Sequence, residues 1–150
     1  MFDDELIKKI DLNVSKKTVM YSPAQLAYAG DAVYELLVRS YIVKNRECNV
    51  NIMNREAVRF VKAHSQAVLV KELEPILTDE EVRIVKRGRN AKITSSPKNA
   101  DLIDYRYATG FEALFGYLYL NNEIDRLLFL FNKIIEIIDN KDKDNKNKKG

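Results

Sequence analysis

Residues 22–44 read SPAQLAYAGDAVYELLVRSYIVK, and this stretch predicts the long helix around which the fold is built. Ser22 suits the N-cap, Pro23 suits the first helical position, and Gln25 completes a capping box with the serine. Beyond this start, apolar side chains recur three or four residues apart, at Leu26, Ala29, Val33, Leu36, Leu37 and Tyr41. That spacing puts them on one side of a helix, so the stretch predicts an amphipathic helix facing a core.

The helical period recurs along the rest of the chain, whereas strand signals are almost absent. The 150 residues include only five Gly and three Pro, and no alternating run is bounded by turn residues. Further helices are expected over residues 51–74, 78–88, 97–107, 108–120 and 124–138. Within residues 51–74 the pattern predicts one face made of Met53, Ala57, Phe60, Val61, His64 and Val68, which favours a packing role for the histidine. We therefore predict an all-α fold with a single domain.

Composition sets the domain boundaries. The folded domain is expected to span residues 22–138, preceded by an N-terminal segment, residues 1–21, that holds a short helix. Residues 139–150, DNKDKDNKNKKG, hold five Lys, three Asp and no apolar side chain. Such a segment cannot bury enough apolar surface to offset the entropy of ordering it. We expect a disordered, solubilising tail.

The overall counts exclude several classes of protein. Lys and Arg number 25 against 22 Asp and Glu, which gives a net charge of only +3. A single cysteine, Cys48, excludes an intramolecular disulfide and a Cys-rich zinc site, and a single histidine, His64, excludes a His-cluster metal site. No apolar run approaches the ~20 residues of a membrane span, and the acidic start lacks the layout of a signal peptide. We expect no membrane partner and a cytoplasmic location.

Two acids stand where a core is expected. Asp31 and Glu112 lie among small and apolar residues, where an ionised carboxylate is costly unless it is paired, hydrogen-bonded or bound to a cation. Ion pairs with Arg39 and Arg106 are one interpretation. A hard-cation site between two helices is the other, because Mg²⁺ is often held by one or two carboxylates together with water and phosphate. Glu35, one turn after Asp31, suits a third ligand, a group that orients the ligands, or a partner for Arg39.

A glycine accompanies each of these acids. Gly30 directly precedes Asp31, and Gly110 lies two residues before Glu112. Glycine inside a helix costs about 1 kcal/mol relative to alanine. Close approach of another backbone or of a ligand would explain that cost.

Basic residues gather in one segment. Residues 83–100 contain no acid and six cations: Arg83, Lys86, Arg87, Arg89, Lys92 and Lys98. Arginine forks, hydroxyl groups and helix-terminal amides are the groups that grip phosphate oxygens. A solvated loop is the simpler interpretation of the segment alone. Together with an acidic pair inside the domain, the segment indicates a phosphodiester substrate.

These motifs resemble a known family. Residues 28–35 (YAGDAVYE) and 111–120 (FEALFGYLYL) resemble the two signature halves of the ribonuclease III catalytic domain. Between them, residues 86–92 (KRGRNAK), 97–99 (PKN) and 105–107 (YRY) are similar to Mini-ribonuclease III, the bacterial branch that has this domain without a double-stranded-RNA-binding domain. The resemblance covers roughly residues 22–138.

The resemblance implies an endoribonuclease that works as a homodimer with a valley for double-stranded RNA. It implies Mg²⁺, with Mn²⁺ able to substitute, products with 5′-phosphate and 3′-hydroxyl ends, and the precursor of 23S ribosomal RNA as substrate. Asp31 and Glu112 are carried over as catalytic metal ligands. A ribosomal protein on the pre-ribosome is a further candidate partner. The expected RNA-binding residues are Lys86, Arg87, Arg89, Asn90, Lys92, Lys98 and Asn99.

Three positions depart from the full-length ribonuclease III pattern. Ala24 and Ala27 stand where that pattern has glutamates, and Thr109 stands where it has an aspartate. Fewer carboxylates bind Mg²⁺ less tightly, which leaves the number of metal ions open. A noncatalytic RNA-binding scaffold is therefore the main alternative, and a protein-interaction domain is a third. The helix over residues 108–120 is apolar nearly all round, which also favours a dimer unless the other helices cover it.

Overall fold

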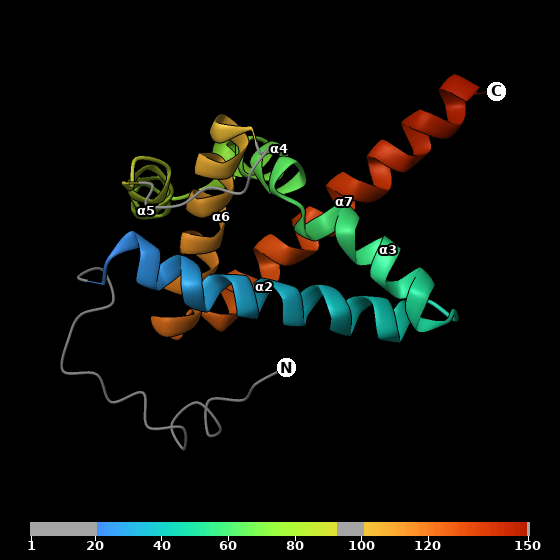
Figure 1. Ribbon diagram of the computed structural model, residues 1–150, viewed down its shortest axis with the longest axis horizontal. Coiled ribbons are helices and arrows are strands. Elements are labelled where there is room, and N and C mark those ends of the chain that lie inside the picture. The colour runs from blue at the N-terminus through green and yellow to red at the C-terminus, as the bar shows by residue number, and fades with distance from the viewer. Residues whose placement is uncertain (1–20, 93–100, 150) are drawn as a thin grey trace, which may run out of the picture.

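The computed structural model describes residues 21–92 and 101–149, and this part of the chain is built from helices joined by short turns (Figure 1). The elements run in the order α2 (Pro23–Asn45), α3 (Val50–Val61), α4 (Ala63–Leu73), the 3₁₀ turn η2 (Glu74–Ile76), α5 (Asp79–Arg89), α6 (Leu102–Leu120) and α7 (Ile124–Lys149). No strand occurs in the ranges given, so the predicted all-α fold is confirmed. None of these helices is long and apolar enough to cross a membrane.

Helix α6 is the central element of the fold. It packs against α2, α4, α5 and α7, and Figure 1 shows α2 crossing it while α7 starts near its lower end and runs toward the upper right. Its aromatic and aliphatic side chains are buried within this one chain, with Phe111, Leu114 and Phe115 at 0% exposure. The other helices therefore cover the apolar surface of residues 108–120, and the expectation that this surface needs a dimer to cover it is wrong.

Glycines set the distance between α2 and α6. A Cβ atom at Gly30 would lie 1.7 Å from the carbonyl oxygen of Glu112, and one at Gly116 would lie 1.8 Å from that of Leu26. The two backbones are therefore in direct contact. Gly110 makes a similar close approach to α5. The backbone contact expected from the in-helix glycines is confirmed, and it brings the segments that carry Asp31 and Glu112 together.

The helix predicted over residues 51–74 is two helices. Lys62 has extended backbone angles, φ −65° and ψ 149°, and it ends α3 and begins α4. The carbonyl of Phe60, near the end of α3, accepts a hydrogen bond from the buried Tyr34 hydroxyl at 3.0 Å. Because the break rotates the buried face, His64 does not pack in the core. Its ring is exposed and contacts the Asp104 carboxylate at 2.8 Å.

The ends of α6 and α7 also differ from the predicted boundaries. Residues 102–120 form one helix, capped by Asp101, whose side chain accepts hydrogen bonds from the backbone of Ile103 and Asp104. The start of the helix predicted over residues 97–107 and the predicted N-terminal helix lie outside the described residues. At the other end of the chain, α7 continues to Lys149.

The extended α7 contradicts the expectation of a disordered tail from residue 139. Asp142 forms an ion pair with Arg59 of α3, and Lys141 forms one with Glu72 of α4 at 2.7 Å. These pairs dock the first turns of the charged segment against the body of the domain. No glycine or proline interrupts residues 124–149, so the helix can continue beyond the docked turns.

Candidate active site

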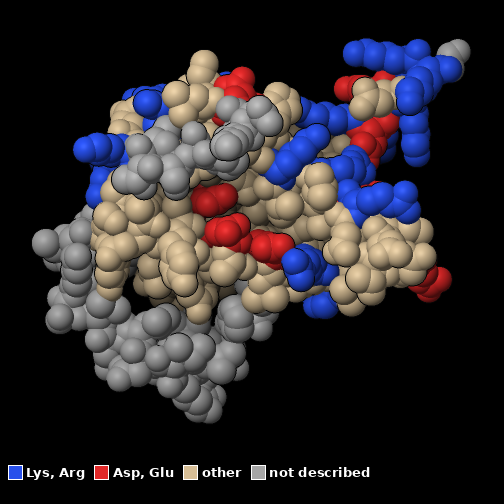
Figure 2. Space-filling view, in the orientation of Figure 1, with Lys and Arg blue, Asp and Glu red and all other residues tan. Residues whose placement is uncertain are grey.

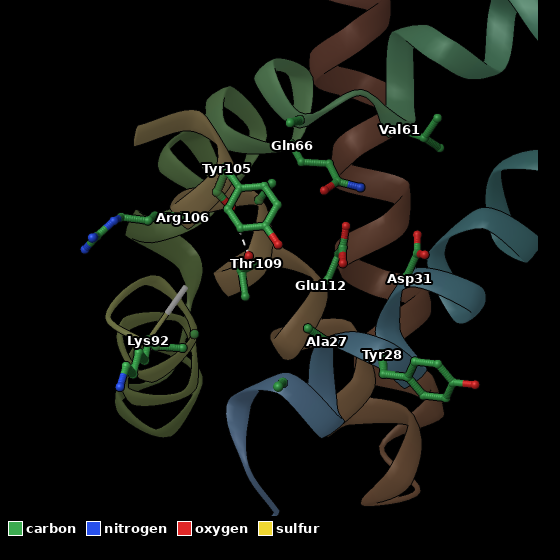
Figure 3. Close-up of a pocket in the computed structure, with 15 residues that line it drawn as sticks. Ala27, Tyr28, Asp31, Val61, Gln66, Lys92, Tyr105, Arg106, Thr109 and Glu112 are labelled. Atoms are coloured by element: carbon green, nitrogen blue, oxygen red, sulfur yellow. Dashed lines mark hydrogen bonds between the residues drawn. The ribbon is translucent and has the colours of Figure 1, made fainter. Parts of the chain in front are cut away.

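A cavity of about 470 Å³ opens beside the crossing of α2 and α6 (Figure 3). Its walls come from four parts of the chain: α2, the α3–α4 junction, α5 with the residues that follow it, and the first half of α6. Asp31 from α2 and Glu112 from α6 both line it, and Figure 3 shows their carboxylates facing the same space. The sequence predicted that these two acids act together, and the crossing of the two helices accounts for their proximity.

The two acids differ in exposure: Glu112 is half-buried, whereas Asp31 is exposed, so the expectation that Asp31 lies in the core is wrong. Burial raises the pKa of Glu112, the negative charge of Asp31 raises it further, and the nearby Gln66 amide lowers it in part, which leaves it at about 7. Burial and the charge of Glu35 raise the pKa of Asp31 as well. Two acids whose pKa values are raised by burial and by neighbouring negative charge form a place that favours a cation.

The structure does not show the ion pairs that were one interpretation of the two acids, with Arg39 and Arg106 as partners. Arg39 pairs with Glu35 at 2.7 Å, one helical turn away, and both side chains are largely exposed. Arg106 points away from Glu112 in Figure 3. Within residues 21–92 and 101–149, no ion pair neutralises Asp31 or Glu112. Glu35 is thus committed to Arg39 in this structure, which agrees with the last of the three roles considered for it.

The three positions that depart from the ribonuclease III pattern all line the cavity. Ala24 and Ala27 present methyl groups to it from α2. Thr109 lies one turn before Glu112, and its hydroxyl donates a hydrogen bond to the Tyr105 carbonyl at 2.9 Å. These side chains add no charge to the site, so its acidity rests on Asp31 and Glu112.

The predicted RNA-binding residues separate into two groups. Lys92 lines the cavity with the acids. Lys86 and Arg89 instead line a separate groove beside Tyr107, where the Arg89 guanidinium lies 5.6 Å from the ring centre. Arg87 donates to the carbonyl of Tyr21 at 3.1 Å.

The remaining predicted RNA-binding residues lie at or beyond the end of α5. Asn90 caps α5 at its C-terminal end and accepts a hydrogen bond from Arg89. Lys98 and Asn99 lie outside the described residues.

Gln66 is the residue of the cavity that the sequence prediction missed. It lies in the first turns of α4, it is only 1% exposed, and its side chain points toward the Glu112 carboxylate (Figure 3). Its Oε1 atom is buried without a hydrogen-bond partner. A buried polar atom left unpaired costs about 1–3 kcal/mol. A glutamine inside an otherwise apolar helix was the signal that could have identified it. However, the prediction treated residues 51–74 as one continuous helix, and in such a helix residue 66 faces away from the core.

The donor set fits a hard cation held by few protein ligands. Carboxylate oxygens are the ligands that Mg²⁺ prefers, and Mg²⁺ commonly keeps several waters beside one or two carboxylates and substrate phosphates. Over the described ranges, no group of three or more His, Cys, Asp or Glu side chains could hold a metal. The site therefore fits a metal completed by water and phosphate rather than a full protein cage.

Comparisons with known proteins agree with this description of the fold and the site. The sequence profile of the Ribonuclease III domain family matches residues 24–123, which include both acids. A Mini-ribonuclease 3 of Clostridium tetani is 46% identical over 117 residues, 77% of this chain and 78% of that protein. A Mini-ribonuclease 3 of Thermoanaerobacter sp. is 42% identical over 133 residues, 89% of this chain and 94% of that protein.

A solved structure shares the fold. The crystal structure of a Fusobacterium nucleatum protein superposes with a TM-score of 0.72 at 30% sequence identity, and the match covers 81% of this chain and 98% of that one. The helical domain, with Asp31 and Glu112 at the crossing of α2 and α6, is thus a ribonuclease III-type endoribonuclease domain. Domains of this class act on double-stranded RNA. Within that class, the chain belongs to the Mini-ribonuclease 3 family, which processes the precursor of 23S ribosomal RNA. Enzymes of the ribonuclease III class are typically Mg²⁺-dependent.

Proposed function

We propose that this chain cleaves double-stranded RNA at the α2–α6 crossing, with Asp31 and Glu112 holding Mg²⁺. The observation that carries the proposal is the pair of carboxylates from two helices that line one cavity without a basic partner in the described ranges. Burial and like charge raise the pKa values of both, and a divalent cation would relieve that cost. Mn²⁺, with the same preference for oxygen ligands, would substitute.

The chemistry supplied by such a cation is activation of a water and neutralisation of charge on the scissile phosphate. Asp31 of α2 and Glu112 of α6 would hold it together, and both would be deprotonated when a metal binds. Lys92, on the α5 side of the same cavity, would attract the phosphate. As the resemblance to ribonuclease III implies, the proposed hydrolysis leaves 5′-phosphate and 3′-hydroxyl ends.

The charge distribution supports a polyanionic substrate. In Figure 2 acidic side chains gather at the centre of one face, over α2 and α6, and Lys and Arg lie on both sides of them. A duplex laid across this face would have its phosphates near the flanking cations and one phosphodiester near the acids. We include Lys86, Arg87, Arg89, Asn90, Lys92, Lys98 and Asn99 in the RNA-binding surface. Each Lys or Arg that contacts a phosphate adds to the salt dependence of binding.

The salt dependence provides a direct test of the basic segment. Replacing Arg87, Arg89 and Lys92 together with alanine should weaken binding of a double-stranded RNA. The slope of log affinity against log salt should fall by roughly 0.9 for each phosphate that the variant no longer neutralises. The slope is measured by titration at several salt concentrations. An unchanged slope would remove the segment from the RNA-binding surface.

We also propose a homodimer. Tyr28, Leu36 and Val43 lie along one side of α2 and are 86%, 42% and 64% exposed. Asp31 is one turn from Tyr28, so a second copy on this side would place two acidic sites close to the interface and in two-fold register for the two RNA strands. Sedimentation at micromolar concentration tests this, and a monomer would count against it.

The proposed substrate is the precursor of 23S ribosomal RNA, with a ribosomal protein on the pre-ribosome as a further partner. This substrate would place the activity in the cytoplasm. The test incubates the precursor with the protein, with and without Mg²⁺, and maps the new ends. An Asp31→Asn variant should fold and bind RNA but fail to cleave. Normal cleavage by that variant would show that the site is assigned wrongly.

A further inference from the structure

We propose that Gln66 is a positioning residue that holds the Glu112 carboxylate in place to receive the cation. The inference rests on the proposed function, because Gln66 can position a metal ligand only if Glu112 binds the metal. It goes beyond that function by assigning a role to a side chain of α4, which carries neither of the two acids. The juxtaposition that carries it is a fully buried amide that lines the same cavity as Glu112 and points toward its carboxylate (Figure 3).

The placement of Gln66 is rigid. Its neighbours in α4, Ala67, Leu69 and Val70, are 1–2% exposed and pack into the core. Figure 3 shows the Gln66 side chain pointing from α4 toward Glu112, from the wall of the cavity opposite α2. Since α4 and α6 are in extensive contact, the amide has little freedom to move away from the carboxylate.

A neutral donor suits this task better than a charged one. An arginine or lysine at this position would pair with Glu112 and cancel the charge that attracts the cation. The Gln66 amide faces the carboxylate, where its N–H group can donate a hydrogen bond and leave that charge in place. It thereby fixes the orientation of the carboxylate, and carboxylates that bind metals are commonly held by such outer hydrogen bonds. With only two acids in the cavity, the orientation of each one matters more.

The unpaired Oε1 atom is a second, independent observation. Gln25, at the start of α2, uses its Oε1 to accept the Ser22 amide at 2.9 Å, as a structural glutamine does. Gln66 Oε1 is buried and accepts nothing from the described part of the chain. A methionine of similar length would fill the same space without burying an unpaired oxygen. The glutamine therefore lowers stability at this position, which is explained if its N–H group serves the site.

The decisive variant is Gln66→Met, measured first for binding of Mn²⁺ alone by electron paramagnetic resonance, without RNA. We expect Mn²⁺ affinity to fall about 10–100-fold, as for other groups that orient metal ligands. The melting temperature should stay the same or rise. The kcat should fall at limiting Mg²⁺ and recover in part at high Mg²⁺, with KM for RNA little changed. Unchanged Mn²⁺ affinity would overturn the proposal.

Two further variants keep the test sharp. Gln66→Asn keeps the amide but shortens the side chain by one methylene, so it should lose Mn²⁺ affinity in the same way, even if the methionine variant does not fold. Tyr34→Phe is the matched control, because it also removes a buried hydrogen bond, 3.0 Å from the Tyr34 hydroxyl to Phe60, but on the core side of α2. It should lower stability and leave Mn²⁺ affinity unchanged. Equal loss of Mn²⁺ affinity in Tyr34→Phe would mean that the effect is general loosening.

The failure of this inference is distinguishable from failure of the proposed function. Asp31→Asn is measured in the same Mn²⁺ titration. If Asp31→Asn abolishes binding while Gln66→Met and Gln66→Asn leave it intact, only the role of Gln66 is wrong. If Asp31→Asn also binds Mn²⁺ normally, the metal site itself is wrong, and the inference fails with it.

Discussion

Two glutamates of this domain occupy contrasting environments. Glu81, in the first turn of α5, is 2% exposed, and its two carboxylate oxygens accept hydrogen bonds from Arg126 of α7 at 2.8 and 2.9 Å. Glu112 in α6 lies near the neutral Gln66 and beside Asp31 in the wall of the cavity. One acid has a full complement of protein partners, and the other has a neutral partner and a like-charged neighbour.

The pKa values of the two acids shift in opposite directions for this reason. Burial alone would raise the pKa of Glu81, but hydrogen bonds from Arg126 and Thr78 outweigh it and lower the pKa. At Glu112, burial and the charge of Asp31 act in the same direction and raise the pKa to about 7. The charge of Glu81 is satisfied inside the protein and stabilises the α5–α7 contact. The charge of Glu112 remains available to a ligand.

The largest expected effect is the loss of cleavage when Glu112 is neutralised. Glu112→Gln removes one of two charges that would hold the metal, and metal catalysis supplies several kcal/mol of transition-state stabilisation. We expect the rate on double-stranded RNA to fall on the order of 10³-fold. Glu81→Gln is the matched control, with the same chemical change at the paired acid, and should cleave normally. Equal losses in both variants would mean that the two acids do not differ in role.

The second prediction concerns the ion pair between Glu81 and Arg126. Arg126→Ala leaves Glu81 buried without its charged partner, which costs about 3–5 kcal/mol for a buried pair. We expect a value near the low end, because the Arg126 side chain is 27% exposed. Urea unfolding at neutral pH measures it. The depressed pKa of Glu81 means that the pair stabilises the fold above the unfolded-state pKa and loses this effect as pH falls through the folded pKa. The difference from the wild type should therefore shrink in acid.

The parts of the fold predicted from sequence are those with local chemical signals. Ser22 caps α2 in the predicted capping box with Gln25, and Thr78 caps α5 in the same way with Glu81, at the start of the helix predicted over residues 78–88. Asn122 adopts a left-handed backbone, φ 58°, between the helices predicted over residues 108–120 and 124–138. The all-helical class and the acidic pair followed from the same kind of pattern.

The errors arise where tertiary contacts override the local pattern. The break between α3 and α4 at Lys62 has no glycine, proline or capping side chain that would predict it. Because of this break, Gln66 is buried and His64 is exposed, the reverse of what a continuous helix predicts. The last turns of α7 continue past residue 138 because Asp142 and Lys141 find partners on α3 and α4. Such partners lie 69 or more residues away in sequence, so periodicity within one helix cannot reveal them.

A third prediction concerns the stability cost of the unpaired acid. The rise in the pKa of Glu112 from 4.5 to about 7 corresponds to at most about 3 kcal/mol, and about 1–3 is expected because the group is not fully buried. In the wild type, the stability associated with protonated Glu112 is full below pH ~4.5 and is lost as pH rises through about 7. Glu112→Gln cannot ionise, so in EDTA it should be more stable than the wild type at pH 8 and not at pH 4. Thermal unfolding at both pH values measures this, and a loss of stability at pH 8 would contradict it.

The smallest effect is expected at Glu35, whose charge lies beside the site but pairs with Arg39. The pair joins two largely exposed side chains, so Glu35→Gln should change stability by only about 0.2–0.5 kcal/mol. Because the charge of Glu35 is one cause of the raised pKa of Asp31, its removal should shift the acidic limb of the cleavage pH profile slightly toward lower pH. The rate at the optimum should stay close to that of the wild type. A metal ligand at Glu35 would instead produce a loss as large as that of Asp31→Asn, so the pH–rate profiles of the two variants, measured side by side, separate a neighbouring charge from a third ligand.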